Sequence, residues 1–164
     1  MSRKILLLFF ILSLNGALAA QRVGRYGTAD RYVSDEDIER SVMKEVNNQR
    51  SRQGRSELNW DEEIARVAQT YSRRMAAEDF FDHFDPEGNT VLERAAKVKG
   101  WSRIGENLFV GDHVANIGPV ALRSWMESST HRVNILDVGW TATGIGIART
   151  KNGEIYITQI FTQE

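Results

Sequence analysis

The chain has 164 residues, of which 41% are hydrophobic, 26% are charged and none is cysteine. This length predicts one domain, because independent cores usually need about 100 to 200 residues each, and a net charge of -1 gives no basic field to attract nucleic acid. The absence of cysteine excludes disulfides, thiolate catalysis and Cys-ligated metal, and leaves His, Asp and Glu as the strong metal ligands.

The first 19 residues have the pattern of an export signal. Arg3 and Lys4 form a cationic start, residues 5–14 are almost purely apolar, and Ala17-Leu18-Ala19 is a small-x-small cleavage pattern. An apolar run of about ten residues is shorter than the roughly 20 that span a bilayer. We therefore predict a signal peptide at 1–19 that is cleaved after Ala19, no transmembrane anchor, and a secreted or periplasmic protein. The missing cysteines fit a bacterial exported protein.

A polar linker is predicted at residues 20–33, which are rich in Gly and Arg and lack a sustained apolar period. The domain is predicted to occupy residues 34–164. Its first helix begins with Ser34, which Asp37 follows as in an N-terminal capping pair, and ends at Gly54. Apolar residues at i, i+4 spacing mark the buried face of this helix, namely Ile38, Val42 and Val46.

Three more helices are predicted in the middle of the chain. The second is capped by Asn59 or Asp61 and has an apolar stripe that includes Ile64, Val67, Ala68, Tyr71 and Met75. Asn89 or Thr90 begins a short third helix that ends near Gly100. Pro119 suits the first turn of a fourth helix, which contains Trp125.

The C-terminal part has the alternation of two antiparallel strands. Residues 141–149 and 154–162 alternate in hydrophobicity, and Asn152-Gly153 between them predicts a two-residue hairpin turn. The second strand is partly apolar on both faces. We therefore expect a sheet that is covered on both sides, with helices as the covers.

Few residues are candidates for catalysis or metal binding. His83 lies in a polar loop after the second helix, and His131 follows the Trp125 helix. His113 is predicted to be a solvated loop residue. Glu106 begins a strand-like segment, where its simplest role is a solvated glutamate on an edge strand. Spacing alone does not choose between functional and structural roles for these side chains. Ser128 and Ser129 lie near His131, but no nucleophile elbow surrounds them, and serine at a helix end is commonly a cap.

Eight segments in order resemble the CAP superfamily, also called the SCP or cysteine-rich secretory protein family, in its bacterial form. The resemblance covers about residues 34–161. The segments are Val46-Asn47-Asn48-Gln49-Arg50, Leu58-Asn59-Trp60-Asp61 with Ile64-Ala65 and Ala68, Phe81-Asp82-His83, Gly105-Glu106-Asn107-Leu108, Ser124-Trp125-Met126-Glu127-Ser128, His131-Arg132-Val133-Asn134-Ile135-Leu136, Thr143-Gly144-Ile145-Gly146-Ile147-Ala148 and Tyr156-Ile157-Thr158-Gln159-Ile160-Phe161.

The resemblance implies an α+β fold, a three-layer α-β-α sandwich with a central antiparallel sheet. It also implies a cleft lined by two histidines and two acids, with Asn107, Trp125, Ser128 and Arg132 around it. The histidines correspond to His83 and His131, and the first acid to Glu106. The second acid falls three residues after the tryptophan in animal and plant relatives, where this chain has Ser128. Glu127 is one position earlier, about 100° away around a helix, so position alone does not assign it to the cleft.

The resemblance suggests a weak Zn²⁺ site formed by His83, His131, Glu106 and Glu127. Two neutral imidazoles and a carboxylate can hold Zn²⁺ and leave a position open for water. The acids could instead orient the imidazoles from the second coordination shell. The competing structural interpretation is that Glu106 pairs with a histidine and fixes the loops over the sheet.

We expect an exported and monomeric binding or interaction module that is not an enzyme, whose ligand is a lipid, a protein or a cell-surface component. The alternative is a hydrolase that acts on protein or the cell wall and depends on a metal or on the His and Glu side chains, with Glu106 as the base. Neither nucleic acid nor a cofactor other than Zn²⁺ is expected.

Overall fold

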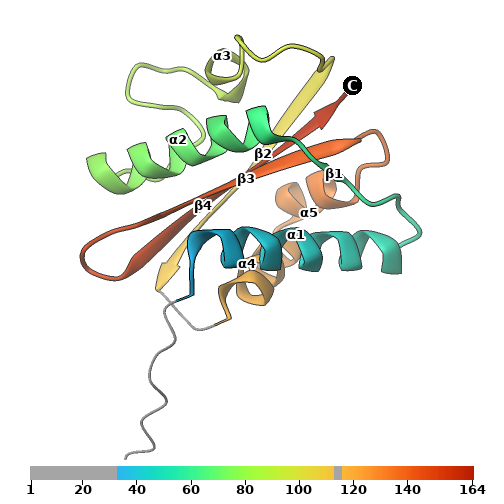
Figure 1. Cartoon of the computed structure of the whole chain (residues 1–164), viewed down its shortest axis with the longest axis horizontal. Helices are drawn as coiled ribbons and strands as arrows, with labels where there is room; N and C mark the ends of the chain where they lie inside the picture. The colour runs from blue at the N-terminus through green and yellow to red at the C-terminus, as the bar shows by residue number, and fades with distance from the viewer. Residues whose placement is uncertain (1–32, 113–115) are drawn as a thin grey trace, which may run out of the picture.

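The structure is a computed structural model and describes residues 33–112 and 116–164 (Figure 1). The predicted signal peptide, nearly all of the predicted linker and His113 lie outside these residues. The elements in order are α1 (Asp35–Arg52), β1 (Asn59–Trp60), α2 (Glu62–Glu78), α3 (Val91–Arg94), β2 (Arg103–Asp112), α4 (Ile117–Glu127), α5 (Ser129–Leu136), β3 (Ala142–Arg149) and β4 (Glu154–Gln163). Within the described residues, no helix combines the length and the hydrophobicity needed to cross a membrane.

A four-stranded sheet with the order β1-β3-β4-β2 forms the central layer. Strand β4 pairs antiparallel with both β3 and β2, whereas the short β1 pairs parallel with β3. Helices α2 and α3 cover one face, and α1, α4 and α5 cover the other (Figure 1). The predicted three-layer sandwich is therefore confirmed, and the parallel edge strand β1 is an addition that the sequence did not indicate.

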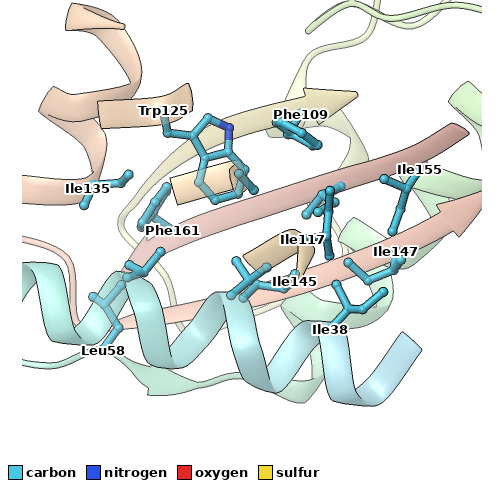
Figure 2. Close-up of a cluster of buried hydrophobic side chains, with 14 of the residues drawn as sticks. Ile38, Leu58, Phe109, Ile117, Trp125, Ile135, Ile145, Ile147, Ile155 and Phe161 are labelled. Carbon is cyan, nitrogen blue, oxygen red and sulfur yellow. The ribbon is translucent and has the colours of Figure 1, made fainter. Parts of the chain in front are cut away.

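The two-sided hydrophobicity of β4 explains why the sheet is buried on both faces. Ile155, Ile157 and Phe161 pack in the main core with α1, α4 and α5, where Trp125 is the largest fully buried side chain (Figure 2). Tyr156, on the other face of β4, packs in a second cluster with residues of α2. Burial of these alternating side chains fixes the register of the strand, because a slip of one residue would exchange its faces.

Glycines on β3 let α2 lie almost in contact with the sheet. A Cβ atom on Gly144 would be 2.2 Å from the backbone nitrogen of Ala65, and one on Gly146 would be 2.0 Å from that of Gln69. Helix α2 could not approach β3 this closely if either glycine had a side chain. Helix α2 ends at Glu78, where the C-cap residue Asp79 adopts a left-handed conformation and donates its N–H to Met75 O, and the loop with His83 follows.

The predicted helix caps are largely those observed. The side chain of Ser34 accepts a hydrogen bond from Asp37 N, and that of Asp61 accepts from Glu63 N and Ile64 N. Thr90 forms a capping box with Glu93. Of the alternatives left open, Asp61 and Thr90 are therefore the caps.

Gly54 ends α1 as predicted, because it follows the C-cap residue Gln53 with a φ of 67°, and Arg55 N donates back to Arg50 O at 2.9 Å. Helix α4 begins at Ile117, so Pro119 lies in its first turn, also as predicted. Helix α3 differs, because it ends at Arg94, well before Gly100. Helix α5 was not predicted as a separate helix, because its weak apolar periodicity buries only Ile135.

The β3–β4 hairpin has a longer loop than the predicted two-residue turn. Thr150 N donates to Glu154 O at 2.9 Å, and Gly153 adopts a φ of 93°. A three-residue loop with glycine in the left-handed region is the next common solution for a hairpin. The Asn-Gly pair therefore indicated the correct hairpin but the wrong loop length.

The packing of α2 on β3 predicts a large cost for Gly146→Ala. The added methyl group meets helix backbone, so we expect a loss of about 3 kcal/mol in the free energy of unfolding. Gly54 has a φ of 67° but open space around its Cβ position, so Gly54→Ala should cost only about 1 kcal/mol. Urea denaturation measures both values, and equal losses would contradict the role of close packing.

Candidate functional site

The candidate site lies at the free edge of β2, where segments from both sides of the sheet meet. Glu106 is on β2, His83 is in the loop after α2, and His131 is in α5. The imidazole rings of His83 and His131 are 6.2 Å apart between centroids, with an angle of 49° between their planes. The structure therefore brings together three of the residues that the resemblance selected.

Side chains from α4 and α5 cap the outer edge of β2. The indole nitrogen of Trp125 donates to Leu108 O at 2.8 Å, and Asn134 Nδ2 donates to Glu106 O at 3.1 Å. Asn107 Nδ2 in turn donates to His131 O at 3.1 Å. These bonds satisfy backbone groups that an edge strand would otherwise leave unpaired, and they hold α5, with His131, against the strand that carries Glu106.

The carboxylate of Glu106 is buried and both of its oxygens are engaged. Oε1 lies 2.8 Å from His83 Nδ1, and Oε2 accepts a hydrogen bond from Arg94 Nη2 at 2.6 Å. Only 7% of Glu106 is exposed, so the simple expectation of a solvated edge-strand glutamate is wrong, although β2 is an edge strand. A carboxylate accepts but does not donate, so His83 Nδ1 carries a proton and the neutral ring keeps its lone pair on Nε2.

Arg94 connects Glu106 to the loop that carries His83. Its guanidinium donates to His83 O at 3.1 Å and to Asn89 O at 2.9 Å, and it stacks 3.4 Å above the ring centroid of Tyr71. The hydroxyl of Tyr71 donates to Asp82 O at 2.6 Å, and burial raises the pKa of Tyr71 to about 12. The hydroxyl therefore stays protonated and keeps the start of the loop in place.

His131 is less easily protonated than an ordinary histidine. Burial lowers its pKa, and the positive charge that His83 can carry lowers it further. A neutral imidazole is the form that can offer a lone pair to a metal ion or to a hydrogen-bond donor. The site therefore presents two imidazoles, one oriented by Glu106 and one kept neutral by burial.

Other residues predicted for the cleft have different surroundings. Glu127 is exposed, and among the described residues no hydrogen bond or ion pair links it to His83, Glu106 or His131. Trp125 is fully buried in the core, Ser128 bonds to the hydroxyl of Thr130, and Arg132 donates to Met126 O. In the part of the chain that the structure describes, no three His, Asp or Glu side chains are grouped so that they could hold a metal ion.

Sequence reasoning did not select three residues that shape the site, namely Arg94, Tyr71 and Asn134. Asn134 lies within a segment that carried the resemblance, three residues after His131, so a same-face helix argument could have found it. Arg94 and Tyr71 had no such signal. Their roles depend on how the end of α2 and the short α3 meet β2 in space.

The buried ion pair predicts strong coupling between Arg94 and Glu106. Each single variant, Arg94→Gln or Glu106→Gln, should lower the free energy of unfolding by about 3 kcal/mol, because it leaves the other charge buried without a partner. The double variant should lose clearly less than the sum. Arg40→Gln, at an exposed pair, is the control and should change stability by less than about 0.5 kcal/mol. Additive losses in urea denaturation would contradict the coupling.

The surroundings of His131 predict a pH effect that NMR titration can measure. The pKa of His131 should lie below about 6.5, and His83→Gln should raise it by removing a neighbouring charge. A lowered pKa means that the unfolded chain binds the proton more readily, so this group lowers stability as pH falls below about 6.5. A pKa at or above the ordinary histidine value would contradict the described burial.

Comparison with known proteins places this geometry in a family. The profile of the cysteine-rich secretory protein family, CAP, matches residues 43–161. The Bacillus subtilis (strain 168) protein YkwD is 28% identical over 122 residues, which are 74% of this chain and 46% of YkwD. The chain thus spans less than half the length of this relative.

Solved structures give the same result. An extracellular protein with an SCP domain from Bacillus anthracis str. Ames is 27% identical with a TM-score of 0.69, and the match covers 79% of this chain and 41% of that one. An outer surface protein from Borrelia burgdorferi shares the fold at 16% identity, with a TM-score of 0.72 over 80% of this chain and 96% of the other. The chain belongs to the cysteine-rich secretory protein (CAP) family.

Proposed function

We propose that the protein is an exported binding module without catalytic activity, and that the imidazoles of His83 and His131 are its binding groups. The observation that carries this proposal is the full engagement of Glu106 by His83 and Arg94. The carboxylate serves to orient His83 and to fix its loop. What remains available for a ligand is the lone pair of each imidazole.

A divalent metal ion such as Zn²⁺ is the ligand that these two groups fit best. Imidazole nitrogen is a common zinc ligand, and a carboxylate that accepts from the second ring nitrogen fixes the tautomer, as Glu106 does for His83. The ion pair with Arg94 keeps Glu106 from acting as a direct ligand. With two protein ligands the site should bind Zn²⁺ weakly, and the metal would supply a point of attachment for a further ligand.

The hydrolase alternative has less support from the geometry. A general base needs a carboxylate oxygen that can take a proton from water, and both oxygens of Glu106 already accept hydrogen bonds. Glu127, the other acid considered for the site, is exposed and has no bond to the histidines among the described residues. A binding role requires neither acid to be free.

An exposed apolar side chain next to His83 supports a ligand with an apolar part. Phe84 follows His83 directly in the chain and is 56% exposed. Exposed apolar residues near a polar site are typical of surfaces that bind ligands or other molecules. A lipid or a cell-surface component is the ligand class that combines these features.

Calorimetric titration of Zn²⁺ into the purified protein at about pH 7.5 tests the metal site, since histidine is mostly neutral there. One-site binding should be lost in His83→Ala and in His131→Ala. Glu106→Gln should lower the affinity about tenfold through its effect on His83. Binding should also weaken as the pH falls toward about 5.5, because both imidazoles must be neutral.

Glu127→Gln is the matched control, because it removes one carboxylate from the same region without touching the imidazoles. It should leave the Zn²⁺ affinity unchanged, and circular dichroism should show that every variant is folded. Absence of binding to the unmodified protein, or full binding by folded His131→Ala, would contradict the proposal. An equal loss of Zn²⁺ affinity in Glu106→Gln and Glu127→Gln would instead indicate that Glu127 is a metal ligand.

A further inference from the structure

One backbone position on the outer edge of β3 is fully buried and has no hydrogen-bond partner on that side within the described part of the chain. Thr143 O on this edge accepts from Asp61 N at 2.9 Å, and the side-chain amide of Gln69 bonds to both the N–H and the C=O of Ile147, at 3.0 and 2.6 Å. Backbone groups of a strand alternate between its two edges, so the N–H and C=O of Ile145 face the same edge between these two contacts. Among the described residues, no hydrogen bond reaches them on this side.

A groove of about 540 Å³ opens at this position, between α1 and α2. Its lining is apolar at Met43, Ala65 and Ile145, and Trp60 at the end of β1 is 39% exposed. The groove is on the opposite edge of the sheet from Glu106, because β3 and β2 lie on either side of β4. It is therefore separate from the histidine cleft.

Three carboxylates line the groove, and the cations beside them are largely committed to other acids. The carboxylates are Glu36, Glu39 and Glu62. Of the two arginines in the lining, Arg40 bonds to Asp37 at 2.6 Å and reaches Glu36 only at 4.0 Å, while Arg66 pairs with Glu63 at 3.5 Å. Neither arginine therefore neutralises the groove fully.

Glu39 is the least satisfied of these acids. It is half-buried and forms no ion pair among the described residues. Burial, together with the neighbouring carboxylates of Asp35 and Glu36 from α1 and Glu62 from α2, raises its pKa to about 7. Arg40 acts in the opposite direction but does not offset them. A cation placed here would stabilise the charged form of Glu39.

We propose that this groove binds a basic segment of a partner protein. The lysine or arginine head of the segment lies among the glutamates, and its apolar stem packs on Met43 and Trp60. Charge complementarity selects this occupant. A second copy of the chain would bring two acidic grooves together, and an acidic or purely apolar segment would leave the carboxylates uncompensated.

Fluorescence anisotropy with a labelled peptide, acetyl-Thr-Lys-Val-Lys-Thr-amide, tests the groove. Glu39→Gln should weaken binding about tenfold, the value of one charged hydrogen bond. Glu57→Gln changes the charge equally at an exposed position outside the groove and should leave the affinity within about twofold. A peptide with glutamate in place of lysine should not bind.

The pH dependence is a second readout. Lysine stays charged between about pH 6 and 8, whereas Glu39 becomes ionised over this range, so the protein should bind more tightly at about pH 8 and Glu39→Gln should lose that change. Equal binding by Glu39→Gln and the unmodified protein, or binding of the acidic peptide, would overturn the proposal. If the protein dimerises and Glu39→Gln abolishes the dimer, the occupant of the groove is a second copy of the chain, and the proposal of a basic partner segment is wrong.

Discussion

The ion pair between Arg94 and Glu106 is the interaction on which the site depends. A carboxylate in this buried position needs a counter-charge, and Arg94 supplies it while also bonding to the backbone of the His83 loop and stacking on Tyr71. One guanidinium thus connects α2, α3, the loop and β2. Without it, Glu106 would be an unpaired charge, and the orientation of His83 would have no fixed partner.

Side chains complete the sheet where backbone pairing ends. On β2, Trp125 and Asn134 bond to the outer carbonyl groups, and on β3 the amide of Gln69 bonds to Ile147. Such caps protect an edge from pairing with other chains. They also determine where ligands can approach. The capped edge of β2 supports the histidine site, and the acidic groove lies beside β3, where the buried Ile145 is part of its lining.

The two proposed sites use different chemistry on opposite edges of one sheet. At β2 the ligand groups are imidazoles, and the nearby acid is already neutralised by an arginine. At β3 the acids themselves are the ligand groups, because the arginines beside them are paired mainly with other carboxylates. A protein with both sites could hold a metal-dependent ligand and a basic partner segment together.

Local patterns in the chain were enough to predict a sheet covered by helices on both sides, most helix caps and the C-terminal hairpin, because hydrophobic period and capping chemistry act over a few residues. Ser34, Asp61 and the alternation of β4 are examples. Resemblance to a family selected His83, Glu106 and His131. The burial of Glu106, its neutralisation by Arg94 and the acidic groove between α1 and α2 became visible in the folded molecule alone. They depend on which segments meet at the two sheet edges, and residues far apart in the chain carry no local signal of that meeting.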